Sequence, residues 1–218
     1  GMIGHLAGGS MTNCTADNTA INLDNGNFYS GILVGKSDGN LTDCSVISTA
    51  GGLFSTTPNS NSLNLGGLCG YLSKTAQRCS VNAPFFVNEL QKTTNSSTTI
   101  GGLVGMLTGE VKACSVKFYE GPTKNIEGDS YSSSIYVKGG DCVTIGGIVG
   151  DSGNASDISD CKYDGQSISG TIDTDIGIYI GGIIGEADAK WHHRNSFKGG
   201  MSIGSKDVPH KDGYKATW

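Results

Sequence analysis

The sequence predicts an all-β fold, and within that class a parallel β-helix, or β-solenoid, of about six coils. A glycine-rich block recurs at nearly regular spacing, and a cysteine-containing block follows most copies at a nearly fixed distance. Gly, Ser, Thr and Asn together make up 93 of the 218 residues, and only 16% of the residues are charged. This composition is typical of a turn-rich β protein and excludes a charge-rich helical bundle.

The first block has two apolar residues between glycines, as in Gly101–Gly105. Its closing glycines are Gly4, Gly35, Gly70, Gly105, Gly150 and Gly185, with spacings of 31, 35, 35, 45 and 35 residues. A short alternating run, such as Thr98–Ile100, precedes most copies and predicts a strand. Glycine weakens a strand unless the backbone bends or approaches another chain closely. Each block therefore predicts two strands joined by a tight bend.

The second block has the pattern apolar-x-x-Cys-x-apolar. Its copies are Leu41–Val46, Ala76–Val81, Val111–Val116 and Ile158–Tyr163, with a degenerate copy around Cys14 and Asn195 in the cysteine position of the last copy. In this pattern the first apolar residue and the cysteine are three positions apart, which breaks the strict alternation of a single strand. The block therefore indicates a corner between two faces of the coil. We expect the cysteines Cys14, Cys44, Cys79, Cys114 and Cys161 to form a buried column of small apolar side chains without disulfides, since their side chains run parallel.

A single repeat has too few apolar groups for a core, so successive repeats must stack. Parallel crossovers favour a right-handed coil. Since about 35 residues is long for one coil, we expect excursions outside the stack at residues 82–98 and 117–142. The alternative is a β-sandwich or β-prism built from hairpins, but Asn-Gly and Asp-Gly pairs do not recur at equivalent places. We assign residues 1–200 to the solenoid and 201–218 to a cap or to the start of a further segment.

Stacking in order predicts contacts between side chains of successive coils. Asp43 and Arg78 each precede a cysteine, and Asp160 and Arg194 repeat this arrangement, so we expect two ion pairs. Asp151 and Glu186 both follow a closing glycine and should also be neighbours. Such carboxylates could hold Ca²⁺ or act as catalytic acids, but a solvated flank is the more common use.

Charge and motifs exclude several function classes. The formal net charge is −5, which argues against nucleic acid as a partner, and no apolar run is long enough for membrane insertion. No Cys-x-x-Cys or His-Glu-x-x-His motif occurs, and the adjacent His192 and His193 would point to opposite faces of a strand. We therefore predict no metal, no cofactor and no catalytic residues.

Binding residues, if any, should lie in the longest excursion. The 45-residue spacing places ten extra residues there, together with the candidate ligand-binding residues Tyr119, Tyr131 and Tyr136. Tyrosine can stack on sugars or anchor a protein partner while donating a hydrogen bond. The alternative is that these aromatic side chains cover the outer sheet.

The paired blocks resemble the GLUG motif, and Gly101–Gly105 with Val111–Val116 is the nearest copy. The resemblance covers residues 1 to about 200 through five or six copies. GLUG repeats occur in bacterial surface and adhesin-like proteins, many from Bacteroidetes, and beside some immunoglobulin-A-specific peptidases. The resemblance implies an extracellular or cell-surface repeat module that presents loops to an unidentified surface protein or glycan. The alternatives are a carbohydrate-active lyase or glycosidase and a structural stalk without a ligand.

Overall fold

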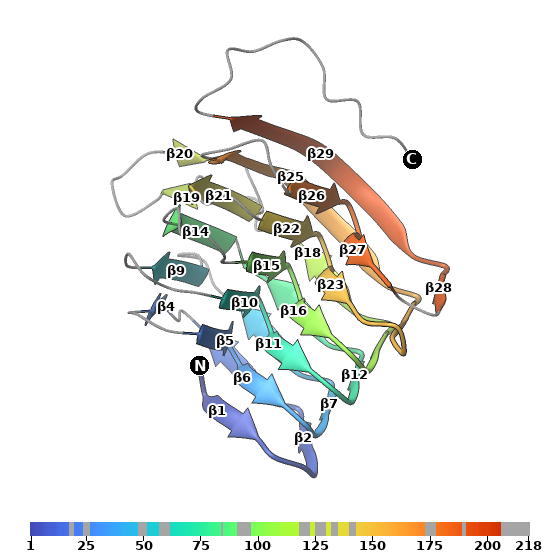
Figure 1. Cartoon of the computed structure of the whole chain (residues 1–218). Helices are drawn as coiled ribbons and strands as arrows, with labels where there is room; N and C mark the ends of the chain where they lie inside the picture. Colours follow the sequence, from blue (N-terminus) through green and yellow to red (C-terminus); the bar gives the residue numbers. More distant parts are fainter. Residues whose placement is uncertain are drawn as a thin grey trace.

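In a computed structural model the chain folds as a parallel β-helix of six stacked coils (Figure 1). The structure describes residues 1–17, 20–23, 27–47, 52–56, 62–83, 85–90, 97–117, 123–124, 130–131, 135–139, 143–172, 178–188 and 191–205. Within this part, strands of successive coils pair in parallel and build four sheets, which we name A to D. The predicted fold class and the stacking order are confirmed, and a hairpin-built sandwich is excluded.

Sheets A and B each hold one strand from every coil. Sheet A consists of β1 (Ile3–Leu6), β6 (Val34–Ser37), β11 (Cys69–Leu72), β16 (Val104–Leu107), β23 (Val149–Ser152) and β27 (Ile184–Ala187). Sheet B consists of β2 (Ser10–Thr12), β7 (Asn40–Thr42), β12 (Thr75–Gln77), β17 (Glu110–Lys112), β24 (Asp157–Ser159) and β28 (Trp191–His193). We number the coils 1 to 6 by their sheet A strands.

Sheet C has two rows of strands that the last two coils join. The first row is β3 (Thr15–Asp17), β8 (Ser45–Ile47), β13 (Ser80–Asn82) and β18 (Ser115–Lys117). The second row is β4 (Ala20–Leu23), β9 (Gly52–Thr56), β14 (Phe85–Leu90) and β21 (Ile135–Gly139). The long strands β25 (Lys162–Ile172) and β29 (Ser196–Ser205) run through both rows.

Sheet D opens coils 2 to 6, since each of its strands leads through the glycine bend into the sheet A strand of the same coil. Its strands are β5 (Asn27–Gly31), β10 (Ser62–Gly66), β15 (Ser97–Gly101), β22 (Val143–Gly146) and β26 (Ile178–Gly181). A separate antiparallel pair, β19 (Thr123–Lys124) with β20 (Ser130–Tyr131), lies outside the four sheets.

The second row of sheet C corrects the expectation of long excursions. Residues 85–90 were expected to leave the stack, but they form β14, which pairs with β9 and β21. The strand β21 likewise belongs to the stack, and its Ile135 and Val137 are buried. A second sheet C strand in each of coils 1 to 4, and the long strands β25 and β29 in coils 5 and 6, therefore account for much of the length that the sequence assigns to loops.

The glycines of the first block lie where the chain passes from sheet D to sheet A. At Gly102, an added Cβ atom would press on the carbonyl oxygen of Gly147 in the next coil and come within 3.1 Å of Val116 Cγ1. At Gly105, it would lie 2.7 Å from the Gly70 oxygen of the preceding coil. Backbones of successive coils thus approach each other too closely at this bend for any side chain, which explains why the glycines recur.

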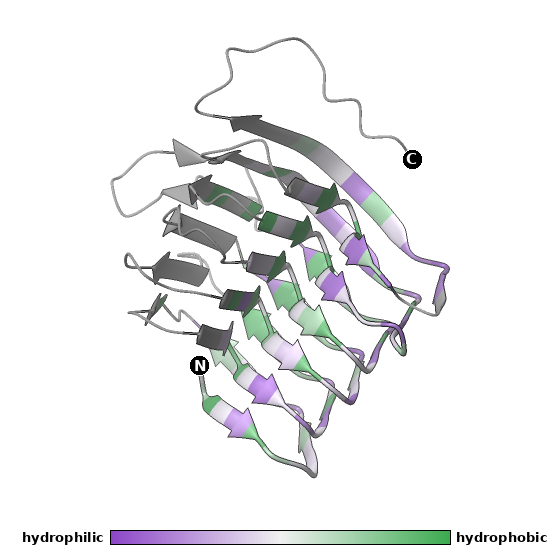
Figure 2. Cartoon of the chain, viewed as in Figure 1, coloured by the Kyte–Doolittle hydropathy of each residue, from purple (hydrophilic) through white to green (hydrophobic). Residues whose placement is uncertain are grey.

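The core consists of rows of equivalent residues. Each row contains the residues that occupy the same buried position in successive coils. One such row lies at the bend and is fully buried; it consists of Leu33, Leu68, Leu103 and Ile148. Hydrophobic and hydrophilic residues share these strands, and hydrophilic residues gather along the turns that lead into sheet B (Figure 2). Burial of these continuous columns is what holds one coil on the next.

The cysteine column lies at the corner between sheets B and C. The residue before each column position, whether Asp43, Ala113 or Arg194, has a left-handed backbone with φ between 51° and 56°. This conformation makes the predicted corner. Among the described residues Cys44, Cys79, Cys114 and Cys161 are buried free thiols, and Cys14 in coil 1 is half-buried.

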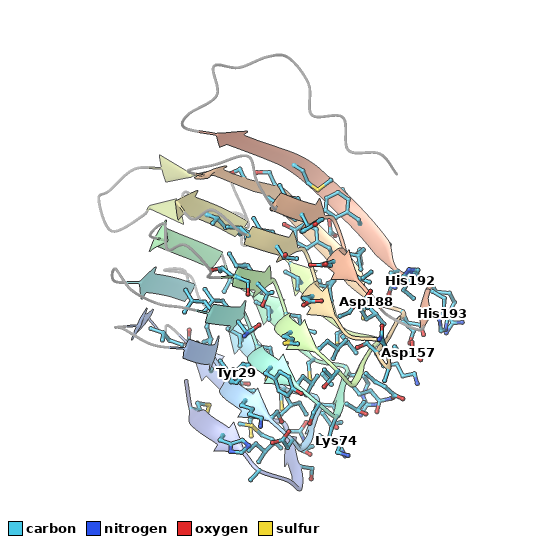
Figure 3. All side chains as sticks on the ribbon, in the orientation of Figure 1. Tyr29, Lys74, Asp157, Asp188, His192 and His193 are labelled. Atoms are coloured by element: carbon cyan, nitrogen blue, oxygen red, sulfur yellow. The ribbon has the colours of Figure 1, made fainter. Side chains whose placement is uncertain are left out.

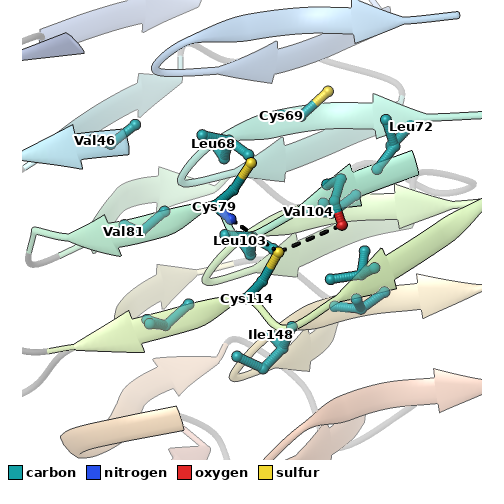
Figure 4. Packing of buried hydrophobic residues seen from close by; sticks show 14 of the residues in the cluster. Val46, Leu68, Cys69, Leu72, Cys79, Val81, Leu103, Val104, Cys114 and Ile148 are labelled. Atoms are coloured by element: carbon teal, nitrogen blue, oxygen red, sulfur yellow. Dashed lines mark hydrogen bonds between the residues drawn. The ribbon is translucent and has the colours of Figure 1, made fainter. Parts of the chain in front are cut away.

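These thiols also form hydrogen bonds, which the sequence pattern does not predict. Cys114 Sγ donates to the carbonyl oxygen of Ala76 in the preceding coil at 3.5 Å and accepts the Cys79 N–H at 3.3 Å (Figure 4). In coil 6, Asn195 takes over both roles: its Oδ1 accepts the Cys161 N–H at 2.9 Å, and its Nδ2 donates to the Ile158 oxygen at 2.8 Å. The column therefore satisfies backbone groups as well as filling space.

Candidate functional site

One residue of each coil follows the closing glycine and lies opposite its counterpart in the next coil. These residues, which we call the A row, are His5, Lys36, Tyr71, Met106, Asp151 and Glu186. All six side chains are exposed or half-buried. The positions two residues earlier are fully buried in coils 2 to 5, where they are Val34, Cys69, Val104 and Val149. The A row thus has a different chemistry in every coil on a scaffold that hardly changes.

The A row has an aromatic and cationic part in coils 1 to 3. The ring centroids of Tyr29 and Tyr71 lie 5.2 Å apart with the planes tilted by 57°, and Lys36 Nζ lies 5.6 Å from the Tyr71 centroid. The Tyr71 hydroxyl is hydrogen-bonded to Thr108 Oγ1 at 3.0 Å, which fixes the ring. Tyr29, which Figure 3 labels, is 47% exposed. The cluster therefore presents an aromatic surface with the Lys36 ammonium and the Tyr71 hydroxyl beside it.

Asp38 connects His5, Lys36 and Ser73 in this part of the A row. It accepts hydrogen bonds from His5 Nε2 at 2.8 Å and from Ser73 Oγ at 2.7 Å, and Lys36 Nζ lies 3.2 Å away. These partners, His5 first, hold the pKa of the Asp38 carboxyl well below its usual range. The carboxylate therefore positions side chains from three successive coils.

The other end of the A row is acidic. Asp151 and Glu186 are paired in register, as the sequence predicts, and Asp188 follows two residues later. Partial burial of Asp151, together with the negative charges of Glu186 and Asp188, raises the pKa of its carboxyl. The row therefore runs from the basic residues His5 and Lys36 in coils 1 and 2 to the acidic residues Asp151 and Glu186 in coils 5 and 6.

The two predicted ion pairs are present at the corner between sheets B and C. Arg78 Nε and Nη2 each donate to one carboxylate oxygen of Asp43 at 2.7 Å. Arg194 binds Asp160 in the same two-bond manner at 2.6 and 2.7 Å. Each pair links neighbouring coils on the surface, so it reports their register while contributing little to stability.

The three predicted tyrosines do not form a described cluster. Tyr119 lies outside the described residues. Tyr131 belongs to β20, opposite Thr123 and outside the four sheets. Tyr136 belongs to β21, where its backbone pairs with Phe86 and Ser169, so it is part of the stack and not of a loop.

His192 and His193 lie on β28 opposite Ile158 and Ser159, and both are exposed. Within the described ranges, no group of three or more His, Cys, Asp or Glu side chains could hold a metal ion. Nor does the described part contain a helix that is long and apolar enough to span a membrane.

The aromatic and cationic cluster was missed from the sequence because its members come from different coils. Tyr29 ends one repeat and Tyr71 begins the next but one, 42 positions later in the chain. The signal that could have revealed the cluster is the register between coils. Asn64 pairs with Tyr29 and Tyr71 pairs with Lys36, so the coil that contains Tyr71 lies next to the strands that carry Tyr29 and Lys36. Comparison of the chain with models of protein families, with curated proteins and with solved structures found no match.

Proposed function

We propose that this chain is a non-catalytic repeat module of an extracellular or cell-surface protein of the GLUG type, with an adhesin-like role. Its partner would be a surface protein or a glycan. The observation that carries the proposal is the contrast between rows: the interior repeats nearly the same residues in every coil, whereas the A row changes from His5 to Glu186. A rigid scaffold with a variable outer surface is how solenoid proteins generally recognise partners.

Exposed aromatic side chains favour a binding module over a stalk without a ligand. Tyr29 and Tyr179 occupy the same register position of sheet D in coils 2 and 6 and are 47% and 50% exposed. Tyrosine gives large contact areas at low cost in conformational entropy, and its ring can stack on a sugar. Many such weak contacts, repeated along a surface, add up to useful avidity.

The state of the cysteines fits an oxidising location. Burial raises the pKa of the Cys44 thiol, and it raises that of Cys69 to about 12. Because the thiolate is the reactive form, Cys44 and Cys69 resist oxidation even outside the cell. The side-chain hydrogen bond with Cys114 lowers the pKa of Cys79 and of Cys161, so these two thiols are protected by burial alone. Free cysteines in the core are therefore compatible with a surface protein.

The carbohydrate-active enzyme is the second candidate, and one observation favours it. A carboxyl with a raised pKa beside a second carboxylate, as in Asp151 and Glu186, is the arrangement that general acid catalysis uses. Hydrolysis or lyase activity on polysaccharides that Asp151→Asn abolishes would establish this alternative.

The proposal is tested by probing glycan and mucin arrays with the purified 218-residue chain. We expect binding to a limited set of glycans or glycoproteins. Deleting residues 121–130, which include β19 and the start of β20, should weaken it and leave cooperative unfolding nearly unchanged, because that pair lies outside the four sheets. The variant Tyr71→Ala measures separately how much the A row contributes to this binding.

The matched control is Tyr163→Phe, since Tyr163 lies in the core and not on the surface. This variant should bind as the wild type does. If the arrays give no binding, or if binding survives both the deletion and Tyr71→Ala, the proposed binding surfaces are wrong. If the deletion unfolds the chain, residues 121–130 serve the fold.

A further inference from the structure

Four buried thiols of the cysteine column keep one position in four successive coils. They belong to Cys44, Cys79, Cys114 and Cys161 in coils 2 to 5. Each sulfur lies 3.2–3.6 Å from two carbonyl oxygens, one two residues earlier in its own coil and one in the preceding coil. The side chains therefore share one orientation, which Figure 4 shows for Cys79 and Cys114.

This shared orientation sets the spacing of the sulfurs. The residues that follow the cysteines are paired in register, as Ser80 is with Ser115, and neighbouring strands of a sheet lie about 4.8 Å apart. Sulfurs that repeat with the coils are therefore about 4.8 Å apart along the column. A linear sulfur–metal–sulfur unit with bonds of about 2.3 Å spans about 4.6 Å. Each gap between two neighbouring sulfurs thus has the length that a two-coordinate metal ion requires.

The column suits a soft ion with two ligands and does not suit an ion that needs four. Thiolates prefer soft ions, among them Cu(I). Because the four sulfurs follow one line, no more than two of them can face the same point. In agreement, the described part of the chain has no group of three or more His, Cys, Asp or Glu side chains that could surround a metal ion. Zn(II), which takes four ligands in a tetrahedron, therefore has no place in the column.

Binding requires that the thiols lose their protons. The Cys79 N–H already donates to the Cys114 sulfur at 3.3 Å, and a hydrogen bond of this kind favours the thiolate. The side-chain hydrogen bond with Cys114 also lowers the pKa of Cys79 and of Cys161.

The protons and charges balance without an oxidant or a reductant. Two thiols that bind one Cu(I) ion release two protons and form a bis-thiolate with one net negative charge. An ion in the next gap shares one of these sulfurs, displaces one proton from one further thiol and leaves the net charge unchanged. The column can therefore fill along its length without an accumulation of charge in the core.

We propose that the cysteine column is a binding site for Cu(I), with one ion in each gap between neighbouring sulfurs. Cys114 is its central ligand, because it has a thiol neighbour in both adjacent coils. No Cys-x-x-Cys motif occurs in the sequence, so only the stacking of coils assembles the site. The site lies inside the stack, so the proposal is independent of the adhesin role.

Titration of the folded, reduced 218-residue chain with Cu(I) under argon, in competition with a coloured Cu(I) chelator, tests the proposal. We expect the chain to take Cu(I) from the chelator. Its Tm should rise with the Cu(I) concentration, because an ion that binds the folded state stabilises it. Circular dichroism should show that the β-helix persists in the loaded chain. The same titration with Zn(II) should leave Tm unchanged.

Cys114→Ser is the decisive variant. A hydroxyl can keep the hydrogen bonds of the column but does not replace a thiolate as a ligand of Cu(I), so the affinity should fall at least about tenfold. Cys69→Val is the matched control: Cys69 is equally buried, but its neighbours in the register are Val34 and Val104. This variant should bind Cu(I) as the wild type does.

A second variant covers the case that Cys114→Ser does not fold. Cys161→Ser removes one gap of the column, whereas the loss of Cys114 removes two, so Cys161→Ser should lower the number of bound Cu(I) ions by one. The count is made on the folded chain after gel filtration.

A chain that takes no Cu(I) from the chelator, or that binds Cu(I) only with loss of its circular dichroism, would overturn the proposal. So would an affinity that Cys114→Ser and Cys69→Val change equally, a count that Cys161→Ser leaves unchanged, or an equal rise of Tm with Zn(II). In each of these cases the ions would not lie between the stacked sulfurs.

Discussion

At the scale of single residues, the cysteine column shows that a small buried side chain can be selected for hydrogen bonding as well as for size. The sequence predicts where Cys114 lies and that it is buried, but it treats the thiol as a small apolar group. In the structure its sulfur accepts the Cys79 N–H and donates to a carbonyl oxygen. The partners come from other coils, so no local pattern could have revealed them.

The thiol bonds predict an order of stability for two variants. Cys114→Ala should lower the free energy of unfolding by about 1–3 kcal/mol, because it leaves the buried Cys79 N–H without an acceptor. Cys114→Ser should cost less, since a hydroxyl can both accept and donate. Urea denaturation measures both. A larger loss for Ser than for Ala would mean that the thiol acts only as an apolar side chain.

Asp151 predicts a dependence on pH. Its pKa is raised in the folded state, so the folded state favours the protonated form, and this contribution is lost as the pH rises through the folded pKa. Asp151→Asn should therefore raise Tm at pH 7 by about 1–3 °C and have almost no effect once the pH falls below about 4.

Asp43→Asn is the matched control with the opposite sign. Arg78 lowers the pKa of Asp43, so this carboxylate stabilises the folded state above its unfolded pKa and loses that effect as the pH falls. The variant should slightly lower Tm at pH 7 and converge with the wild type in acid. Thermal unfolding curves at both pH values decide; equal shifts for the two variants would contradict the account.

At the scale of elements, the glycine bend between sheets D and A sets the geometry of the coil. Gly102→Ala should lower the free energy of unfolding by about 1–3 kcal/mol or more, because the new Cβ atom would press on the backbone of the next coil. Gly153→Ala is the control: its Cβ would meet Thr108 Cγ2 at 3.5 Å, an ordinary contact. Equal effects in chemical denaturation would show that backbone approach does not explain the recurring glycines.

The elements also mark the limit of prediction from sequence. Sheets A and B and the corner were predictable because glycine and cysteine recur at fixed positions, and the pairs Asp43–Arg78 and Asp160–Arg194 followed from that register. The second row of sheet C was not, because Gly52–Thr56, Phe85–Leu90 and Ile135–Gly139 share no motif and begin at different distances from the preceding cysteine. Its strands are recognised only by their pairing across coils.

At the scale of the whole molecule, the stack separates stability from surface chemistry. Columns such as Leu33 to Ile148 stabilise the contact between coils, whereas the A row leaves one position per coil that can change without disturbing a column. The cluster of Tyr29 and Tyr71 could not be assigned from sequence for the same reason: its residues have no fixed spacing within one repeat and meet only across coils. A change of surface residues should accordingly alter binding and leave folding intact.

The measurement that tests this claim most directly compares ligand affinity with melting temperature in two variants of the 218-residue chain. Tyr29→Ser combined with Tyr71→Ser changes only the surface cluster, and Leu103→Ala truncates a fully buried column residue. We predict that the surface variant loses at least about tenfold in affinity for an array ligand with Tm nearly unchanged. The core variant should lose about 2–5 kcal/mol of stability and keep its affinity at temperatures where it is folded. Affinity that follows stability in both variants would contradict the separation of scaffold and binding surface.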